Sequence, residues 1–215
     1  MPLRTRLFAN MPDLSRLFSG SKAKFVNWVN SLGIVRSFLD IFIGITRKRD
    51  LPAFVTEPFT EWYKKNRSQI NEDSNLPKVV LFPDTFNNYH QPQVLISALE
   101  ILEALGFDVL LPESCCCGRA SICKGLIKKA KTSAGRGDES LGHSASKGIP
   151  IVGLEPGCML TMREEHIWLL PDNEKTKLIA ENSYLFEEFI VSLKENGKIN
   201  LTFSDSIQEI LLHGH

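Results

Sequence analysis

The 215-residue sequence lacks an excess of charge of either sign, because 25 Lys and Arg residues balance 25 Asp and Glu residues. Because the chain has no net charge, its overall electrostatic potential does not attract a polyanion, and we predict no nucleic-acid partner. The sequence also lacks a long hydrophobic run. Its longest apolar segment, residues 34–45, covers about a dozen positions and contains Arg36 and Asp40. A segment of that length is too short to span a bilayer.

Cysteine is sparse and its number is odd, with five cysteines in the chain. Five thiols in a chain of this length do not form a disulfide scaffold. The first residues, Met1 to Phe8, carry charges with no apolar run behind them, so we do not expect a secretory signal peptide. We therefore expect a reducing, cytoplasmic setting. Clustered thiols in that setting are more often metal ligands or redox groups than disulfides.

Nucleotide-binding loops are missing too, since the sequence has neither G-x-G-x-x-G nor G-x-x-x-x-G-K followed by Ser or Thr. Residues 132–148 do contain four glycines and four serines. Glycine costs up to about 1 kcal/mol per helical position relative to alanine. We therefore expect the helix that enters this segment to break, and residues 132–148 to form a loop without a phosphate-binding role.

From residue 77 onward, short apolar runs alternate with amphipathic helical segments. Alternating strands and helices predict βαβ units, so the expected fold class is α/β with a parallel sheet. Before them, residues 51–75 are predicted to be a connector with one short helix at 60–67. The predicted strands are 78–82, 107–111 and 149–153, with candidates at 199–203 and 209–212, and the predicted helices are 91–105, about 121–131, 159–170 and 175–193.

The first 50 residues are predicted to be helical. Val35, Phe38, Leu39, Phe42 and Ile43 recur at i, i+3, i+4, i+7 and i+8, which is one face of a helix. We favour a helix that docks on a neighbouring domain. An interfacial membrane helix is the alternative.

Polar and thiol side chains follow the predicted strands at the point where each strand ends. Asp84 follows the first strand, Cys115 to Cys117 the second, and Glu155 with Cys158 the third. His213 and His215 follow the last candidate strand. The carboxyl ends of parallel strands meet at one edge, where open α/β sheets bind ligands. We therefore expect these four segments to converge on one site.

Three consecutive cysteines, Cys115, Cys116 and Cys117, are the strongest local signal. Side chains at three successive positions point in different directions, so no single packing surface explains them. Thiolate is the soft ligand that iron–sulfur clusters require, and Gly118 lets the backbone turn tightly. Cys116, Cys117 and Cys158 are therefore the candidate metal ligands.

Other interpretations of these residues stay open. A zinc site would lack a CxxC pair, and nothing places His143 or His166 beside a cysteine nucleophile. Asp84 and Glu155 are either poor ligands for iron–sulfur chemistry or caps of the helices that follow them. Cys123 stands alone in the sequence, and we expect it to be a small buried hydrophobe.

The segments around the cysteines resemble a known family. Cys116-Cys117-Gly118 after a βαβ unit, followed by residues 148–161, is similar to the cysteine-rich CCG domain. This domain occurs in heterodisulfide reductase, in glycolate and lactate oxidation systems and in anaerobic glycerol-3-phosphate dehydrogenase. The sequence of residues 82–86, 116–119, 154–158 and 180–188 more closely resembles the iron–sulfur oxidoreductase region of FAD-linked D-2-hydroxyacid dehydrogenases of the D-lactate type.

The resemblance implies a fold of paired α/β halves, similar to the CCG-containing part of heterodisulfide reductase. Residues 77–215 would be the first half of a CCG domain, truncated at the C-terminus, and residues 1–76 a helical linker and docking segment. The chain would then be a fragment, since the FAD-binding domain, the ferredoxin-like clusters and the second half are missing from it. Alone it would lack the flavin and could not oxidise a hydroxyacid.

The resemblance also implies cofactors, partners and a role. A 4Fe-4S cluster would pass electrons from FAD, in the missing N-terminal domain, to a quinone, a cytochrome or a soluble carrier. Partners would be the FAD-binding and ferredoxin-like domains, in the cytoplasm or peripherally at the inner face of the membrane. The residues carried over are Cys116, Cys117 and Cys158 as metal ligands, with Asp84, Glu155 and His213 beside the cofactor.

This chain departs from the family pattern at two ligand positions. Asp84 stands where the full pattern has its first cysteine, and Glu155 stands where a CxxC pair with Cys158 would begin. Cys115 is an extra thiol. Two rival functions follow: a CCG component of a disulfide- or quinone-reducing complex, or a degenerate structural half that docks the flavin domain and binds no metal.

Overall fold

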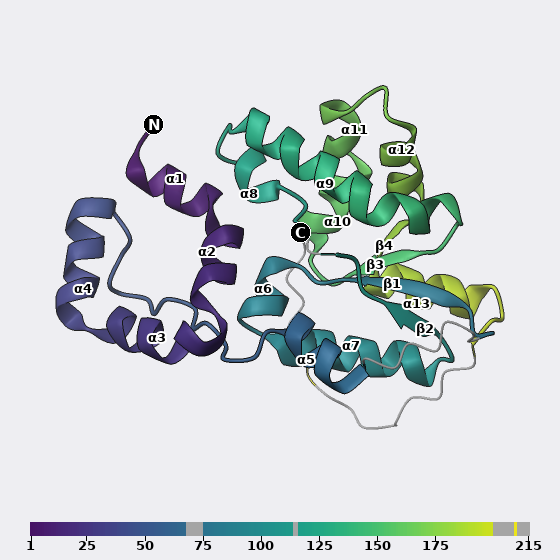
Figure 1. Ribbon diagram of the computed structural model, residues 1–215, viewed down its shortest axis with the longest axis horizontal. Coiled ribbons are helices and arrows are strands. Elements are labelled where there is room, and N and C mark those ends of the chain that lie inside the picture. Colours follow the sequence, from purple (N-terminus) through teal and green to yellow (C-terminus); the bar gives the residue numbers. More distant parts are fainter. Residues whose placement is uncertain (68–74, 114–115, 200–208, 210–215) are drawn as a thin grey trace.

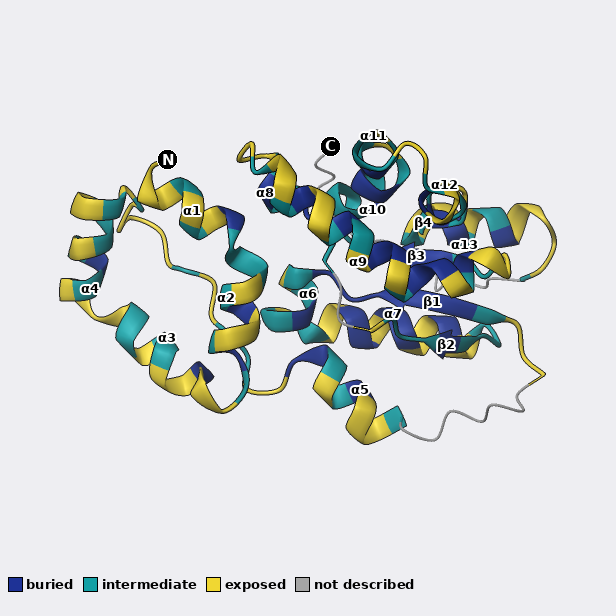
Figure 2. Ribbon diagram, turned by 45° about the horizontal axis from the view of Figure 1, so that its top comes forward, coloured by how far each residue is buried: buried dark blue, intermediate teal, exposed yellow. Residues whose placement is uncertain are grey.

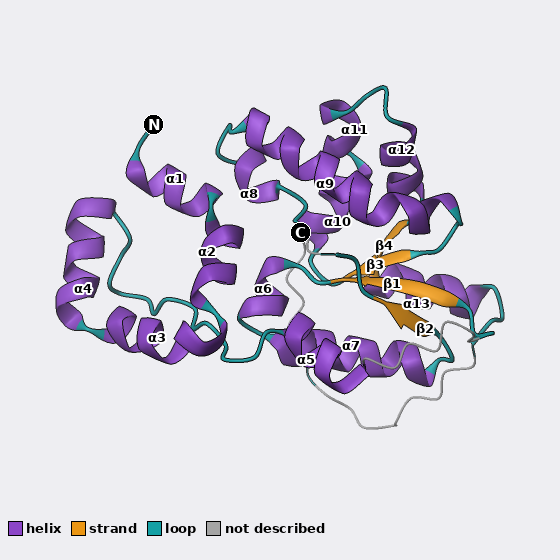
Figure 3. Ribbon diagram, in the orientation of Figure 1, coloured by secondary structure: helices purple, strands orange, loops and turns teal. Residues whose placement is uncertain are grey.

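The structure, a computed structural model, describes residues 1–67, 75–113, 116–199 and 209. These residues form an α/β fold around a four-stranded, all-parallel sheet, which confirms the predicted fold class (Figure 1). The strand order is β2-β1-β3-β4, and helices lie on both faces of the sheet (Figure 3). The strands are β1 (Lys78–Phe82), β2 (Asp108–Leu110), β3 (Ile151–Gly153) and β4 (Ser183–Leu185).

Strand β1 divides the hydrophobic core in two, because successive side chains of a strand point to opposite faces. Val79 and Leu81 belong to one buried cluster, and Val80 and Phe82 belong to another. None of these four side chains is more than 2% exposed, and the buried layers lie on both sides of the sheet (Figure 2). The first cluster includes residues of α5 (Phe59–Arg67), α7 (Pro92–Ala104) and α13 (Phe186–Glu195), and the second includes residues of α9 (Ile127–Ser146), α10 (Pro156–Arg163) and α12 (Glu174–Glu181).

The order of the strands switches beside β1. Strand β2 pairs with one edge of β1, and the next strand along the chain, β3, pairs with the other edge. Val80 is therefore in register with both Leu110 and Ile151. Ligands of open parallel sheets bind at such a switch point, beyond the carboxyl ends of the strands. The segments that leave β1, β2 and β3 border this position.

The prediction of a loop at residues 132–148 is wrong, because α9 runs as one helix through most of that segment. Its small residues form a buried stripe. A Cβ atom at Gly142 would lie 2.9 Å from Cδ of Lys175 in α12, and one at Gly137 would lie 3.8 Å from Cε1 of His166 in α11 (Glu165–Leu169). Gly142 leaves room for the side chain of Lys175, and the burial of this face of α9 against α11 and α12 outweighs the low helix propensity of glycine. The buried residues of α9 are Ala130, Ala134, Gly137, Asp138, Leu141, Gly142 and Ala145.

Other predicted elements are confirmed with changed boundaries. The helix predicted at about 121–131 is divided into α8 (Arg119–Ile122) and the start of α9, and Gly125 turns the chain between them with φ +72°. The helix predicted at 159–170 is divided into α10 and α11. The helix predicted at 175–193 is interrupted by β4, which the sequence did not predict. The strands predicted at 199–203 and 209–212 fall almost entirely outside the described residues.

The first 43 residues are helical, as predicted, and lie beside the sheet rather than on its faces (Figure 1). On the predicted apolar face, Phe38 is 53% exposed and Phe42 is 70% exposed. No helix in the described ranges has both the length and the apolar character needed to cross a bilayer. The helical elements of the first 43 residues are α1 (Leu3–Ala9), α2 (Met11–Phe18), η1 (Gly20–Lys22), α3 (Ala23–Ser31), α4 (Gly33–Phe38) and the π-helical turn η2 (Leu39–Ile43).

Replacing Gly135 with alanine tests the helical assignment of α9. A Cβ atom at Gly135 meets nothing within 4 Å, so alanine adds helix propensity without a clash. We expect Gly135→Ala to raise the free energy of unfolding by about 0.5–1 kcal/mol, measured by chemical denaturation. In the matched control, Gly153→Ala, the new methyl group would overlap Sδ of the buried Met159 and should cost about 1–3 kcal/mol. An unchanged stability for Gly135→Ala would contradict the helix.

Candidate functional site

Three of the four segments predicted to converge lie at the carboxyl edge of the sheet. Asp84 follows β1 and caps α6 (Thr85–Tyr89), Cys116 and Cys117 follow β2, and Glu155 follows β3 and caps α10. Cys158 lies in the first turn of α10. The fourth segment, with His213 and His215, is outside the described residues, and so is Cys115.

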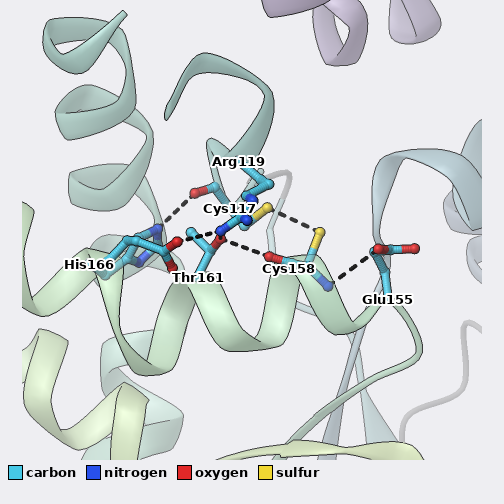
Figure 4. Close-up of polar contacts among 8 residues, drawn as sticks. Cys117, Arg119, Glu155, Cys158, Thr161 and His166 are labelled. Carbon is cyan, nitrogen blue, oxygen red and sulfur yellow. Dashed lines mark hydrogen bonds and ion pairs between the residues drawn. The ribbon is translucent and has the colours of Figure 1, made fainter. Parts of the chain in front are cut away.

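The sulfur atoms of two segments are in contact. Sγ of Cys117 donates a hydrogen bond to Sγ of Cys158 over 3.0 Å (Figure 4). Cys117 is 4% exposed, whereas Cys116 and Cys158 are half-buried. The backbone N–H of Gly118 donates to Sγ of Cys116 over 3.4 Å. The structure therefore brings together the three thiols that the sequence selected.

Gly118 makes the turn that presents these thiols. Its φ of +79° lies in the left-handed region, which favours glycine. A Cβ atom would also lie 3.0 Å from Cβ of Ser133 in α9. Backbone conformation and close packing therefore both require glycine after the two cysteines.

The surroundings favour protonated thiols. The hydrogen bond with Cys117 and then burial raise the pKa of Cys116. The hydrogen bond with Cys116 lowers the pKa of Cys117, but its bond to Cys158 and its burial raise that pKa well above the ordinary value. Cys158 follows the same pattern: its bond with Cys117 lowers its pKa, while burial and the negative charges of Asp84 and Glu155 raise it. Thiolates at this site would need a bound cation.

Both carboxylates act as helix caps. Oδ1 of Asp84 accepts hydrogen bonds from the backbone N–H groups of Phe86 and Asn87, each at 3.0 Å, and Oδ2 accepts from Nδ2 of Asn87 at 2.6 Å. Oε1 of Glu155 accepts from the N–H of Gly157 at 3.3 Å. The capping interpretation is thus confirmed for both residues. A role beside a cofactor stays a prediction.

His166 is a site residue whose contact the sequence did not predict. Its Nε2 lies 2.7 Å from the backbone carbonyl oxygen of Cys117, and its side chain is 2% exposed. A carbonyl can only accept, so Nε2 carries the proton. Burial lowers the pKa of His166, which keeps the ring neutral. His166 therefore positions the cysteine backbone, whereas His143 is exposed on α9.

Arg119 joins the cysteine turn to the helices behind it. Its guanidinium pairs with Glu165 in α11 and lies 3.5 Å from Oγ1 of Thr161 in α10 (Figure 4). Thr161 in turn donates to the carbonyl of Gly157 at 2.7 Å. The only sequence signal for this role was the place of Arg119 directly after Gly118.

The expectation for Cys123 is wrong, because its side chain is exposed. Cys123 ends the four-residue helix α8, and the chain turns away at Gly125 before α9 begins. The short helix leaves no second layer to cover the thiol. Cys123 therefore lies outside the thiol site and serves as a control in experiments on it.

The donor set fits a sulfur-ligated iron centre in its chemistry, but the described arrangement is that of hydrogen-bonded thiols. Two thiolates on a tetrahedral metal at about 2.3 Å are separated by about 3.8 Å, which exceeds the 3.0 Å between Cys117 and Cys158. Within the described ranges, no group of three or more His, Cys, Asp and Glu side chains is arranged to hold a metal ion. Ligation would require the two sulfurs to separate and lose their protons.

Comparison with known proteins shows homology to dehydrogenases. The chain is 32% identical over 188 residues to one of the subunits of anaerobic glycerol-3-phosphate dehydrogenase of Escherichia coli (strain K12), an alignment that covers 86% of this chain and 46% of that protein. It is 27% identical over 175 residues to D-2-hydroxyglutarate dehydrogenase of the same strain, covering 77% and 17%. It is 31% identical over 121 residues to lactate utilization protein A of Bacillus subtilis (strain 168), covering 54% and 49%.

This chain spans less than half the length of each of these relatives. No protein-family model matches the chain, and no solved structure matches it. The homology supports an oxidoreductase-type role in general. It does not select a substrate, because the names of the relatives refer to three different compounds.

Replacing His166 tests its role in holding the cysteine turn. His166→Ala removes a buried ring and leaves the Cys117 carbonyl without its donor. We expect the free energy of unfolding to fall by about 2–4 kcal/mol, measured by urea denaturation. The control His143→Ala changes an exposed ring and should stay within about 0.5 kcal/mol. Equal effects of the two variants would show that the contact contributes nothing specific.

Proposed function

We propose that this chain is the electron-transfer part of an FAD-dependent 2-hydroxyacid dehydrogenase of the D-lactate type. It passes electrons from the flavin to an acceptor. The observation that carries the proposal is the convergence of Cys116, Cys117 and Cys158 from two strand ends. The homology to dehydrogenases supports the same reaction class. Cys116, Cys117 and Cys158 resemble the cysteines of a CCG domain, while Asp84 and Glu155 depart from its pattern.

The three thiols would hold an iron–sulfur cluster, with Asp84 and Glu155 bordering it and His213 supplied by the segment that follows. Such a cluster supplies one-electron transfer. The chain's own residues prepare the position. The N–H of Gly118 points at Sγ of Cys116, and hydrogen bonds to sulfur tune the potential of a cluster. Cys117 itself is buried, so water has little access to its sulfur.

The proposed partners are the FAD-binding and ferredoxin-like domains of the whole protein. Residues 77–215 would form the first half of a CCG domain, and residues 1–76 would link it to the preceding domain. The electron acceptor would be a quinone, a cytochrome or a soluble carrier. The proposed location is the cytoplasm, with residues 1–50 docked on a neighbouring domain. Peripheral placement of these residues at the inner face of the membrane is the alternative.

A structural role without a metal is the second candidate. The 3.0 Å contact between Cys117 and Cys158 favours it, because the thiols satisfy each other without an ion. Carboxylates at the two remaining ligand positions favour it as well, since both already cap helices. In this case the domain would dock the flavin domain and carry no electrons.

Iron and acid-labile sulfide analysis of the anaerobically purified chain separates the two candidates. We expect at least about one iron per chain and a visible charge-transfer band, because three soft donors converge. Cys117→Ser and Cys158→Ser should lose most of the iron. Cys123→Ser, which changes the exposed thiol outside the site, should retain it. If the unmodified chain contained less than about one iron and showed no charge-transfer band, cluster binding would be ruled out and the structural role without a metal would be favoured.

The membrane position is supported by the surface of the N-terminal helices. Residues 1–50 contain nine Lys and Arg residues but only three Asp and Glu residues. Within them, Phe25 is 66% exposed, Trp28 58% and Phe42 70%. Exposed aromatic side chains beside basic residues are typical of helices that lie in a membrane interface.

Vesicle co-sedimentation tests this position. We expect binding to vesicles containing phosphatidylglycerol, weakened by salt, and little binding to phosphatidylcholine alone. The double variant Trp28→Ala/Phe42→Ala should bind roughly tenfold more weakly, because two aromatic contacts are lost. Trp168→Ala is the matched control, since Trp168 is 85% exposed on α11. Unchanged binding of the double variant would contradict the role of these aromatic side chains, and no binding of the unmodified chain to either kind of vesicle would favour docking on a neighbouring domain.

A further inference from the structure

A cavity of about 860 Å³ lies beside the thiol site. Its floor is formed by the segments that follow β1 and β2, including Thr85, Tyr89 and Cys116. Residues of α2 and α9 form two of its walls. Small-molecule sites commonly have volumes of about 300–1,000 Å³ and lie at the carboxyl edge of parallel sheets. The cavity therefore has the size and place of a ligand site.

Polar contacts hold the two walls together. Nζ of Lys129 in α9 lies 2.7 Å from Oδ2 of Asp13 in α2. Oγ of Ser121 donates to the carbonyl of Ala9 at the end of α1. Farther along α2, Oγ of Ser15 lies 3.3 Å from Nε2 of His90. The first two helices are thus attached to α9, to α8 and to the segment that follows α6.

The lining is positively charged. Among the described residues that line the cavity, five are basic and two are acidic, although the whole chain has no net charge. Asp13 is already paired with Lys129. In the described part of the chain, Arg16, Lys128 and Arg136 make no ion pair with another side chain. The uncompensated charge favours an anion.

The basic residues are placed to surround a ligand. Lys128 and Arg136 are spaced by eight residues along α9, which places them on one face of the helix, and Arg16 lines the same cavity from α2. Tyr89 adds a hydroxyl to the floor. Burial raises its pKa, so the hydroxyl keeps its proton and can donate to an anion.

We propose that this cavity binds a small organic anion, a carboxylate or phosphate ester, held by Arg16, Lys128 and Arg136. The volume exceeds the need of an inorganic anion, so the ligand carries a carbon skeleton that fills the remaining space against Cys116 and Pro112. The site depends on the walls of the cavity and not on a metal at the thiols. It is therefore tested on the metal-free chain, and its outcome is independent of the iron analysis.

Isothermal titration calorimetry with four probes identifies the recognised group. 3-Phosphoglycerate carries both anionic groups, succinate carries carboxylates only, glycerol 1-phosphate carries a phosphate ester only, and glycerol is the neutral control. We expect saturable binding of 3-phosphoglycerate, and binding of either single-type probe shows which group is held. Binding of glycerol as tight as that of the anions, or no binding of any anion, would overturn the proposal.

Charge-neutralising variants locate the binding. Arg16→Gln and Arg136→Gln should each weaken 3-phosphoglycerate binding by roughly tenfold, because each removes a charge-assisted hydrogen bond. The matched control is Lys131→Gln, an exposed cation of α9 that does not line the cavity, and it should leave binding unchanged. All three side chains are exposed, so far-ultraviolet circular dichroism should show intact folds. Equal weakening by all three variants would show non-specific attraction and overturn the proposal.

Discussion

Parallel pairing of β1 with β2 and β3 is the constraint on which the site depends. Because the three strands run in the same direction, the segments that leave them emerge at one edge. Asp84, the cysteine turn and Glu155 are distant in sequence, yet they share this edge. Both the thiol contact and the basic cavity lie there, since both use residues that follow β2.

Much of this edge could be predicted from sequence, because it rests on local patterns. Apolar runs placed β1, β2 and β3, and cysteines directly after strands placed the thiols. The sequence could not predict that α9 continues beyond residue 131, because its glycines suggest a loop when only neighbours along the chain are considered. The helix is stabilised by close packing against α11 and α12, where glycine at position 142 avoids a clash with Lys175. Strand β4 was not predicted either, because its three residues follow a helical pattern and only their pairing with β3 makes them a strand.

The contacts that hold the thiol site in place could not be predicted from the sequence either. His166 and Cys117 are separated by 49 positions, and Arg119 and Glu165 by 46. Neither pair forms a motif, and each becomes meaningful only when α11 packs behind the cysteine turn. Cys123 shows the converse, since a lone cysteine suggests burial but the brevity of α8 leaves it in solvent.

The contact between Ser121 and Ala9 has a mechanical consequence. Ser121 lies three residues after Gly118, so the N-terminal helices are attached almost directly to the turn that carries Cys116 and Cys117. A displacement of α1 would have to break or carry along the hydrogen bond between Ala9 and Ser121, which lies close to this turn. The position of α1 and the turn that carries the two cysteines are therefore linked through a hydrogen bond between segments 112 residues apart.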